Sequence, residues 1–119
     1  MTLGSLIKFL KVADPQSRVC YDFGYTYPHS PHSWRGVYSE LAFDYSEGNF
    51  DEMPTVTDFL KMLETEVLGK NFVGWKGGDF VMDGVVSLHV AHSGESGHTA
   101  ISSAIENYGY VILETRYDG

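Results

Sequence analysis

The arginine at position 35 has an unusual setting in a chain with three arginines and sixteen carboxylates. It lies between Trp34 and Gly36, in the segment Ser-Trp-Arg-Gly-Val-Tyr-Ser-Glu that spans residues 33–40. A guanidinium can bind a phosphate through two parallel hydrogen bonds, and its flat face can stack on a base. An arginine beside a glycine and aromatic rings therefore indicates a group that recognises an anion. The alternative is a structural ion pair with one of the many carboxylates.

The segment Trp75-Lys76-Gly77-Gly78 is a second candidate for phosphate binding. Its two glycines permit the backbone conformations that present successive N–H groups to an anion, and Lys76 adds a positive charge. The spacing matches neither GxxxxGK[ST] nor GxGxxG. A tight loop between a helix and a strand is the alternative interpretation.

Alternation in two predicted strands places His89 and Arg116 on partly polar faces. In residues 85–92 the apolar side chains alternate with His89, which therefore lies on the opposite face from them. In residues 110–117, Arg116 shares a face with Glu114. His89 and Arg116 could thus line one binding surface, and an ordinary solvated sheet face is the alternative. A third possibility is an acid–base couple of His89 and Glu114 in a hydrolase.

The five histidines form no pattern that predicts a metal site. Neither HxH nor HExxH occurs, and Cys20, the single cysteine, has no second thiol to act with. No GxSxG segment surrounds a nucleophilic serine. We therefore expect no metal, no cofactor and no catalytic residue.

Length and charge exclude several classes of protein. A chain of 119 residues predicts one domain over residues 1–119, and no apolar run is long enough for a transmembrane helix. The N-terminal segment lacks the pattern of a signal peptide, and a single cysteine fits a reducing cytoplasm. The net charge of −8 opposes binding to DNA or RNA, so a bound anion should be small. An acidic inhibitor that docks on a basic host protein is the rival interpretation.

The candidate residues must be positioned by helices and strands, and the sequence patterns of these elements predict an α+β fold. We expect two helices packed on a mostly antiparallel sheet. Thr2 and Thr55 have the N-cap pattern, and Pro15 ends the first helix. Residues 24–34 contain two prolines and two histidines and are expected to form a long loop. The predicted strands cover residues 18–23, 37–45, 80–82, 85–91, 100–105 and 110–117, the last two as a hairpin.

The order of these segments resembles a known family. An N-terminal helix is followed by S-W-R-G-x-Y-x-E-L-A, T-V-x-x-F-L, F-x-G-W-K-G-G-D-F and a last strand that ends in T-R. This pattern covers most of the chain and is similar to that of small phage proteins of the type-one Thoeris anti-defence family. Those proteins are sponges that bind cyclic ADP-ribose isomers, such as glycocyclic ADP-ribose, without cleaving them. They thereby remove the signal that bacterial TIR-domain enzymes make.

The resemblance implies specific ligand-binding residues. Arg35 matches the arginine of the R-G-x-Y segment, and Arg116 matches an arginine at the end of the last strand. His89 stands where the family has an aromatic residue that stacks on adenine, and Thr99 stands where a polar residue contacts ligand. The resemblance also implies a homo-oligomer, a dimer or a hexamer, with pockets between subunits. It places the protein in the cytoplasm of an infected bacterial host, with cyclic oligonucleotides of a second defence system (CBASS) as possible further ligands.

Overall fold

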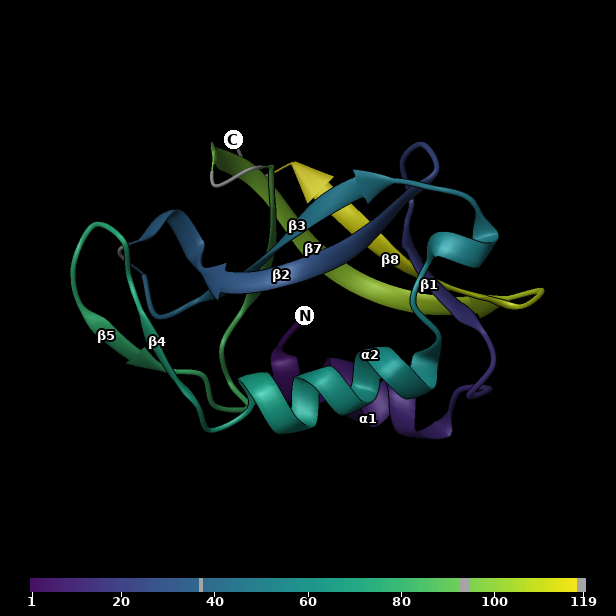
Figure 1. The fold of residues 1–119 in the computed structure, drawn as a ribbon, viewed down its shortest axis with the longest axis horizontal. Helices are drawn as coiled ribbons and strands as arrows, with labels where there is room; N and C mark the ends of the chain where they lie inside the picture. Colours follow the sequence, from purple (N-terminus) through teal and green to yellow (C-terminus); the bar gives the residue numbers. More distant parts are fainter. Residues whose placement is uncertain (37, 93–94, 118–119) are drawn as a thin grey trace.

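Two helices lie against one face of a large sheet in the computed structural model, which describes residues 1–36, 38–92 and 95–117 (Figure 1). The expected α+β class with a mostly antiparallel sheet is confirmed. No helix within these ranges is both long enough and apolar enough to cross a membrane. The helical elements are α1 (Leu3–Val12), α2 (Val56–Met62) and the π-helical turn η3 (Leu63–Val67) that continues α2.

The large sheet has six strands in the order β1-β8-β7-β6-β3-β2. Two neighbouring pairs, β1 with β8 and β3 with β6, are parallel, and the other three are antiparallel. The predicted hairpin is formed by β7 and β8. The strands are β1 (Arg18–Tyr21), β2 (Thr26–Ser33), β3 (Leu41–Glu47), β6 (Leu88–His92), β7 (Glu95–Asn107) and β8 (Tyr110–Tyr117).

Both helices begin at the predicted caps. The Thr2 hydroxyl accepts a hydrogen bond from the backbone N–H of Ser5 at 3.2 Å, and the Thr55 hydroxyl accepts one from Asp58 at 3.1 Å. Each hydroxyl satisfies one of the donors that the first helical turn leaves without an intrahelical acceptor. The caps therefore fix where each helix starts.

The apolar core fills the space between the helices and the sheet. Burial of a large aliphatic or aromatic side chain contributes about 1.5–3 kcal/mol, so this layer holds the sheet in place. We call the opposite side of the sheet the outer face; it carries the residues that alternate with the core positions. Core side chains include Leu6, Leu10, Phe59 and Leu63 from the helices, and Phe43, Val90, Ile101 and Leu113 from the strands.

The prediction of a loop at residues 24–34 is wrong, because most of this segment forms strand β2. Pro28 and Pro31 lack the N–H that a central strand needs, but β2 is at the edge of the sheet and pairs on one side only. A β-bulge between His29 and Pro31 accommodates Ser30, whose φ is 51°. Prolines therefore mark an edge strand here and not a loop.

Neither edge of the large sheet presents an open row of backbone donors. The free side of β1 is covered by residues 54–56, since Val19 N donates to Pro54 O and Val56 N donates to Ser17 O, both at 2.8 Å. At the other edge, the two prolines of β2 remove donors. Both arrangements are ways in which proteins prevent a sheet from pairing with another chain.

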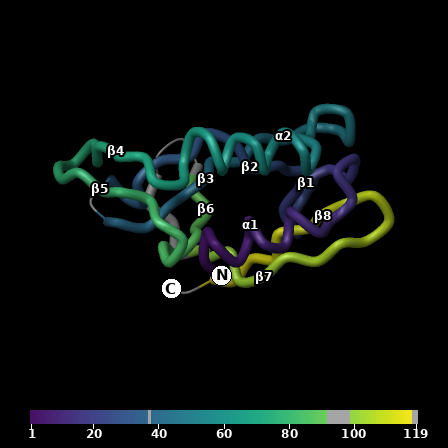
Figure 2. Tube along the Cα trace, turned by 90° about the horizontal axis from the view of Figure 1, so that it is seen from below, coloured from purple at the N-terminus to yellow at the C-terminus, as the bar shows by residue number. Residues whose placement is uncertain are grey.

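Two shorter segments lie beside the sheet. Strand β4 (Asn71–Val73) pairs with β5 (Asp79–Val81), and this hairpin projects at the end of the molecule opposite the β7–β8 turn (Figures 1 and 2). A 3-10 turn, η1 (Trp34–Gly36), follows β2, and another, η2 (Phe50–Glu52), follows β3. The strand predicted from Val37 begins only at Leu41 in β3, and position 37 lies outside the described residues.

Candidate functional site

A stack of aromatic side chains covers the outer face of β6. The imidazole of His89 lies against the indole of Trp34, with ring centroids 3.9 Å apart and planes within 7°. His89 pairs with Ala42 on one side and Ala100 on the other, and these small side chains leave room for the indole above the sheet. As a result His89 is only 8% exposed.

The guanidinium of Arg35 lies over the same indole, 4.4 Å from the centroid of Trp34. The backbone of Arg35 is left-handed, with φ 57°, and Gly36 follows at φ 73°. A left-handed conformation costs a residue with a side chain about 1–2 kcal/mol. Neighbouring hydrogen bonds hold the turn, since Trp34 N donates to Glu40 O at 2.8 Å. Such strain is typical of functional positions.

The Trp75-Lys76-Gly77-Gly78 segment packs directly on this turn. Lys76 N donates to Gly36 O at 3.1 Å, and a Cβ added at Gly36 would lie 2.5 Å from the indole of Trp75. Gly77 N donates to Gly74 O at 3.0 Å, so the N–H groups of Lys76 and Gly77 are both used within the protein. The segment therefore forms a tight loop, and the side chain of Lys76 adds an exposed positive charge to it.

Strand register brings Arg116 to the same face as His89. His89 pairs with Ala100, and Ala100 pairs with Arg116, so all three side chains lie on the outer face. Two strand spacings separate the His89 and Arg116 backbones, which is about 10 Å. Thr99 pairs with Val90 and so lies on the other side of the sheet. The structure thus places three of the four candidate residues, namely Arg35, His89 and Arg116, on the outer face, and Thr99 on the other side of the sheet.

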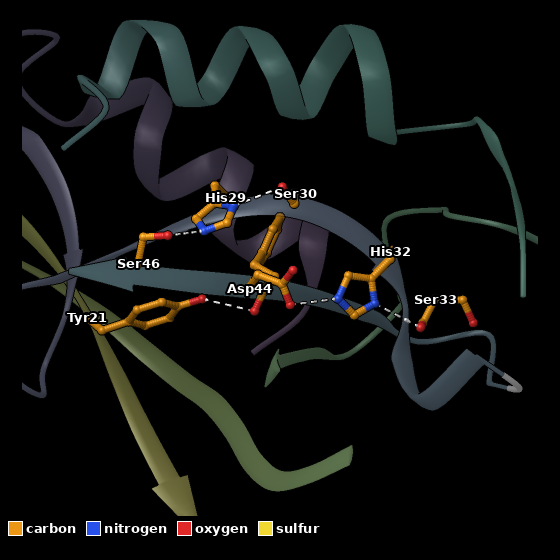
Figure 3. Close-up of polar contacts among 8 residues, drawn as sticks. Tyr21, His29, Ser30, His32, Ser33, Asp44 and Ser46 are labelled. Carbon is orange, nitrogen blue, oxygen red and sulfur yellow. Dashed lines mark hydrogen bonds and ion pairs between the residues drawn. The ribbon is translucent and has the colours of Figure 1, made fainter. Parts of the chain in front are cut away.

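Sequence reasoning missed a polar cluster on the outer face of β2 and β3 (Figure 3). His32 Nε2 is 3.2 Å from Asp44 Oδ1, and His29 Nε2 is 2.6 Å from Ser46 Oγ. The ring of His32 also meets Trp75 edge-on, with centroids 5.3 Å apart, so the cluster continues into the candidate site. The signal was present in the alternation of polar residues along 26–33, but the prolines obscured it.

The metal site and the His89–Glu114 couple considered from the sequence can be compared with the described residues. Across the described ranges, no three histidine, cysteine, aspartate or glutamate side chains come together to hold a metal ion. Glu114 accepts a hydrogen bond from Ser103 Oγ at 2.6 Å, while His89 is covered by Trp34. The proposed couple of Glu114 and His89 is therefore engaged in other contacts.

A hollow of about 520 Å³ lies toward the other end of the outer face. Its walls are largely apolar, but the carboxylates of Asp22 and Glu114 line it and would repel a phosphate. Cys20 is among its lining residues, and burial and, to a lesser extent, the charge of Asp22 raise the pKa of its thiol to about 11. This hollow does not suit an anion, so the positive groups near Trp34 remain the better candidate site.

Comparison with known proteins gives no relative from which a function could be transferred. No family model, no curated protein and no solved structure matches this chain.

Proposed function

We propose that this protein binds and sequesters a cyclic ADP-ribose isomer, without cleaving it, on the outer face beside Trp34. The observation that carries the proposal is the position of Arg35. Its guanidinium is held 4.4 Å from the indole of Trp34 by a left-handed backbone, on the face to which the register also brings Arg116. Two guanidinium groups and aromatic rings are the groups that a base with two phosphates requires.

The magnitudes are compatible with tight binding. Nanomolar affinity corresponds to about 12 kcal/mol. Each charge-assisted hydrogen bond contributes about 1.5–3 kcal/mol, and stacking of a base adds about 1–3 kcal/mol. A cyclic ligand has little conformational entropy left to lose, which reduces the cost of binding. Two arginines, one stacked base and a few backbone donors would be sufficient.

The resemblance to Thoeris anti-defence sponges gives this binding a role. In that role a phage protein removes the TIR-derived signal in the cytoplasm of the infected host and so inhibits Thoeris immunity. Pockets between the subunits of a homo-oligomer, and cyclic oligonucleotides of CBASS at a second site, belong to the same proposal.

Titration calorimetry with glycocyclic ADP-ribose tests the proposal. We expect saturable binding by the wild-type protein and a loss of at least 10-fold in affinity for Arg35→Ala and for Arg116→Ala. Lys8→Ala is the matched control, because it removes one exposed positive charge from α1, on the helix side of the sheet. Heating the complex should release unaltered ligand. Absence of binding refutes the proposal, and recovery of linear ADP-ribose indicates a hydrolase instead.

An acidic inhibitor of a basic host protein is the second candidate, favoured by the net charge of −8. Under this alternative, Arg35→Ala leaves inhibition intact, whereas charge reversal of exposed carboxylates abolishes it. A sponge shows the opposite pattern.

A further inference from the structure

The hollow on the outer face near the β7–β8 turn has the size of a small-molecule site. Its volume of about 520 Å³ falls within the range of about 300–1,000 Å³ that such sites occupy. Its walls are mainly apolar, and two of the apolar side chains that line it remain open to solvent, with Tyr25 81% exposed and Ile105 42% exposed. Concave apolar surface that water can reach favours a ligand with apolar surface of its own.

Two carboxylates give this hollow a negative charge. The backbone N–H and the hydroxyl of Thr115 donate to the carboxylate of Asp22 at 2.8 Å and 2.6 Å. Ser103 Oγ donates to Glu114 Oε1 at 2.6 Å. These donors are uncharged, so the hydrogen bonds orient the two carboxylates without neutralising them.

The strand register sets the two carboxylates side by side. Asp22 N donates to Leu113 O at 3.2 Å, which continues the parallel pairing of β1 with β8 and brings Asp22 next to Glu114. Neighbouring strands are about 4.8 Å apart, so the two negative charges repel each other. A cation between them would offset this repulsion, whereas an anion would add to it.

The cation that suits these walls is an organic one. Met53 and Ile112 line the hollow without an oxygen or nitrogen atom in their side chains, so they cannot replace the water around a metal ion. Cys20 adds no thiolate at neutral pH, because burial raises its thiol pKa to about 11. An ammonium group can instead form charge-assisted hydrogen bonds to the carboxylates while the body that carries it covers the apolar walls.

We propose that this hollow binds a small organic cation, a protonated amine or a quaternary ammonium joined to an apolar body, beside Asp22 and Glu114. The proposal does not depend on the sponge function. Arg18 pairs with Tyr110 in the register, but its guanidinium donates to the backbone oxygens of residues 50, 51 and 53. The outer face then carries two sites of opposite charge, with positive groups beside Trp34 and carboxylates in the hollow.

Three probes with the same indole body and different charges test the proposal. They are tryptamine, which is a cation, tryptophol, which is neutral, and indole-3-acetate, which is an anion. In titrations of the ¹⁵N-labelled full chain, tryptamine should produce saturable amide shifts at Cys20, Ile105 and Ile112. Tryptophol should bind several-fold more weakly, and indole-3-acetate should not bind there. Butylamine, which has the amine without the ring, should also bind more weakly than tryptamine.

Amide substitutions remove the charges and keep an oxygen acceptor. Asp22→Asn and Glu114→Gln should each weaken tryptamine binding about 1.5- to 5-fold, the range for loss of one exposed ion pair, and the double variant about 2- to 25-fold. Binding of tryptophol should not change. Glu66→Gln is the matched control, because it removes an exposed carboxylate from η3 on the helix side of the sheet.

Several results would overturn the proposal. These are equal affinity for tryptamine and tryptophol, butylamine binding as tight as that of tryptamine, and wild-type affinity for tryptamine in the double variant. Amide shifts that are absent at millimolar tryptamine, or confined to residues near Trp34, would refute it as well. Thermal unfolding checks the variants, and if the double variant does not fold, the comparison of probes on the wild-type protein decides.

The sponge function is tested separately. Asp22→Asn should leave calorimetric binding of glycocyclic ADP-ribose unchanged, because Asp22 lies in the hollow and not beside Trp34. If the wild-type protein does not bind glycocyclic ADP-ribose, the proposed function fails while the cation site stands or falls by the indole probes.

Discussion

Replacement of Gly36 by alanine should disturb the turn that carries Trp34 and Arg35. Two costs combine. At φ 73° a residue with a side chain costs about 1–2 kcal/mol. The new Cβ would also lie 2.5 Å from the indole of Trp75, and overpacking of this kind costs about 1–3 kcal/mol.

Gly69→Ala is the matched control, because Gly69 has φ 74° and nothing lies within 4 Å of an added Cβ. Gly69→Ala therefore incurs only the cost of the left-handed backbone and not that of a close contact. At about 2.1 cal/mol/K per residue, the unfolding entropy of 119 residues makes 1 kcal/mol equivalent to about 4 °C. The melting temperature should therefore fall by about 4–8 °C for Gly69→Ala. For Gly36→Ala it should fall by about 4–12 °C more than that.

Binding provides the second measurement. Gly36→Ala shifts Trp34 and Arg35 and should weaken calorimetric binding of glycocyclic ADP-ribose at least several-fold, whereas Gly69→Ala should not. Equal shifts of the two variants in both assays would refute the argument that contact with Trp75 positions this turn.

Two further predictions concern stability. Because burial raises the pKa of Cys20 to about 11, the folded protein keeps the thiol proton between pH 9 and 11 while the unfolded chain loses it, so the free energy of unfolding falls as pH rises through that window. Urea titrations at pH 8, 9 and 10 should show this fall in the free energy of unfolding. Cys20→Ala should make the fall smaller but not abolish it, because burial also raises the pKa of Tyr21. An unchanged dependence of the free energy of unfolding on pH in Cys20→Ala would contradict the assignment. Thr55→Ala removes the cap of α2 and should lower the free energy of unfolding in urea by about 1 kcal/mol. Thr57→Ala, two residues further on, removes only an exposed hydrogen bond from its hydroxyl to Pro15 O at 3.2 Å and should cost less.

Local patterns were sufficient to predict the helices and most of the sheet. A hydroxyl residue before an apolar stripe located both caps, and strand alternation correctly placed His89 and Arg116 on one face. These features depend on residues within a few positions of one another. The π-helical end of α2 has no comparable local signal and was not predicted.

Contacts between distant segments could not be predicted in the same way. The stack of Trp34 on His89 joins positions 55 residues apart in sequence, and it exists because Ala42 and Ala100 flank His89 in the assembled sheet. The packing of Trp75 on Gly36 likewise depends on where the β4–β5 hairpin projects. Residue types indicated which side chains could bind an anion, but only the pairing of strands shows which of them meet.

The closed edges of the large sheet have a consequence for abundance. A protein that acts by stoichiometric capture must reach a concentration comparable to that of its ligand, since each binding site neutralises a single molecule. At such concentrations an open strand edge would template stacking of one chain on the next. Residues 54–56 along β1 and the prolines of β2 remove that template, so the chain can accumulate while its outer face stays available.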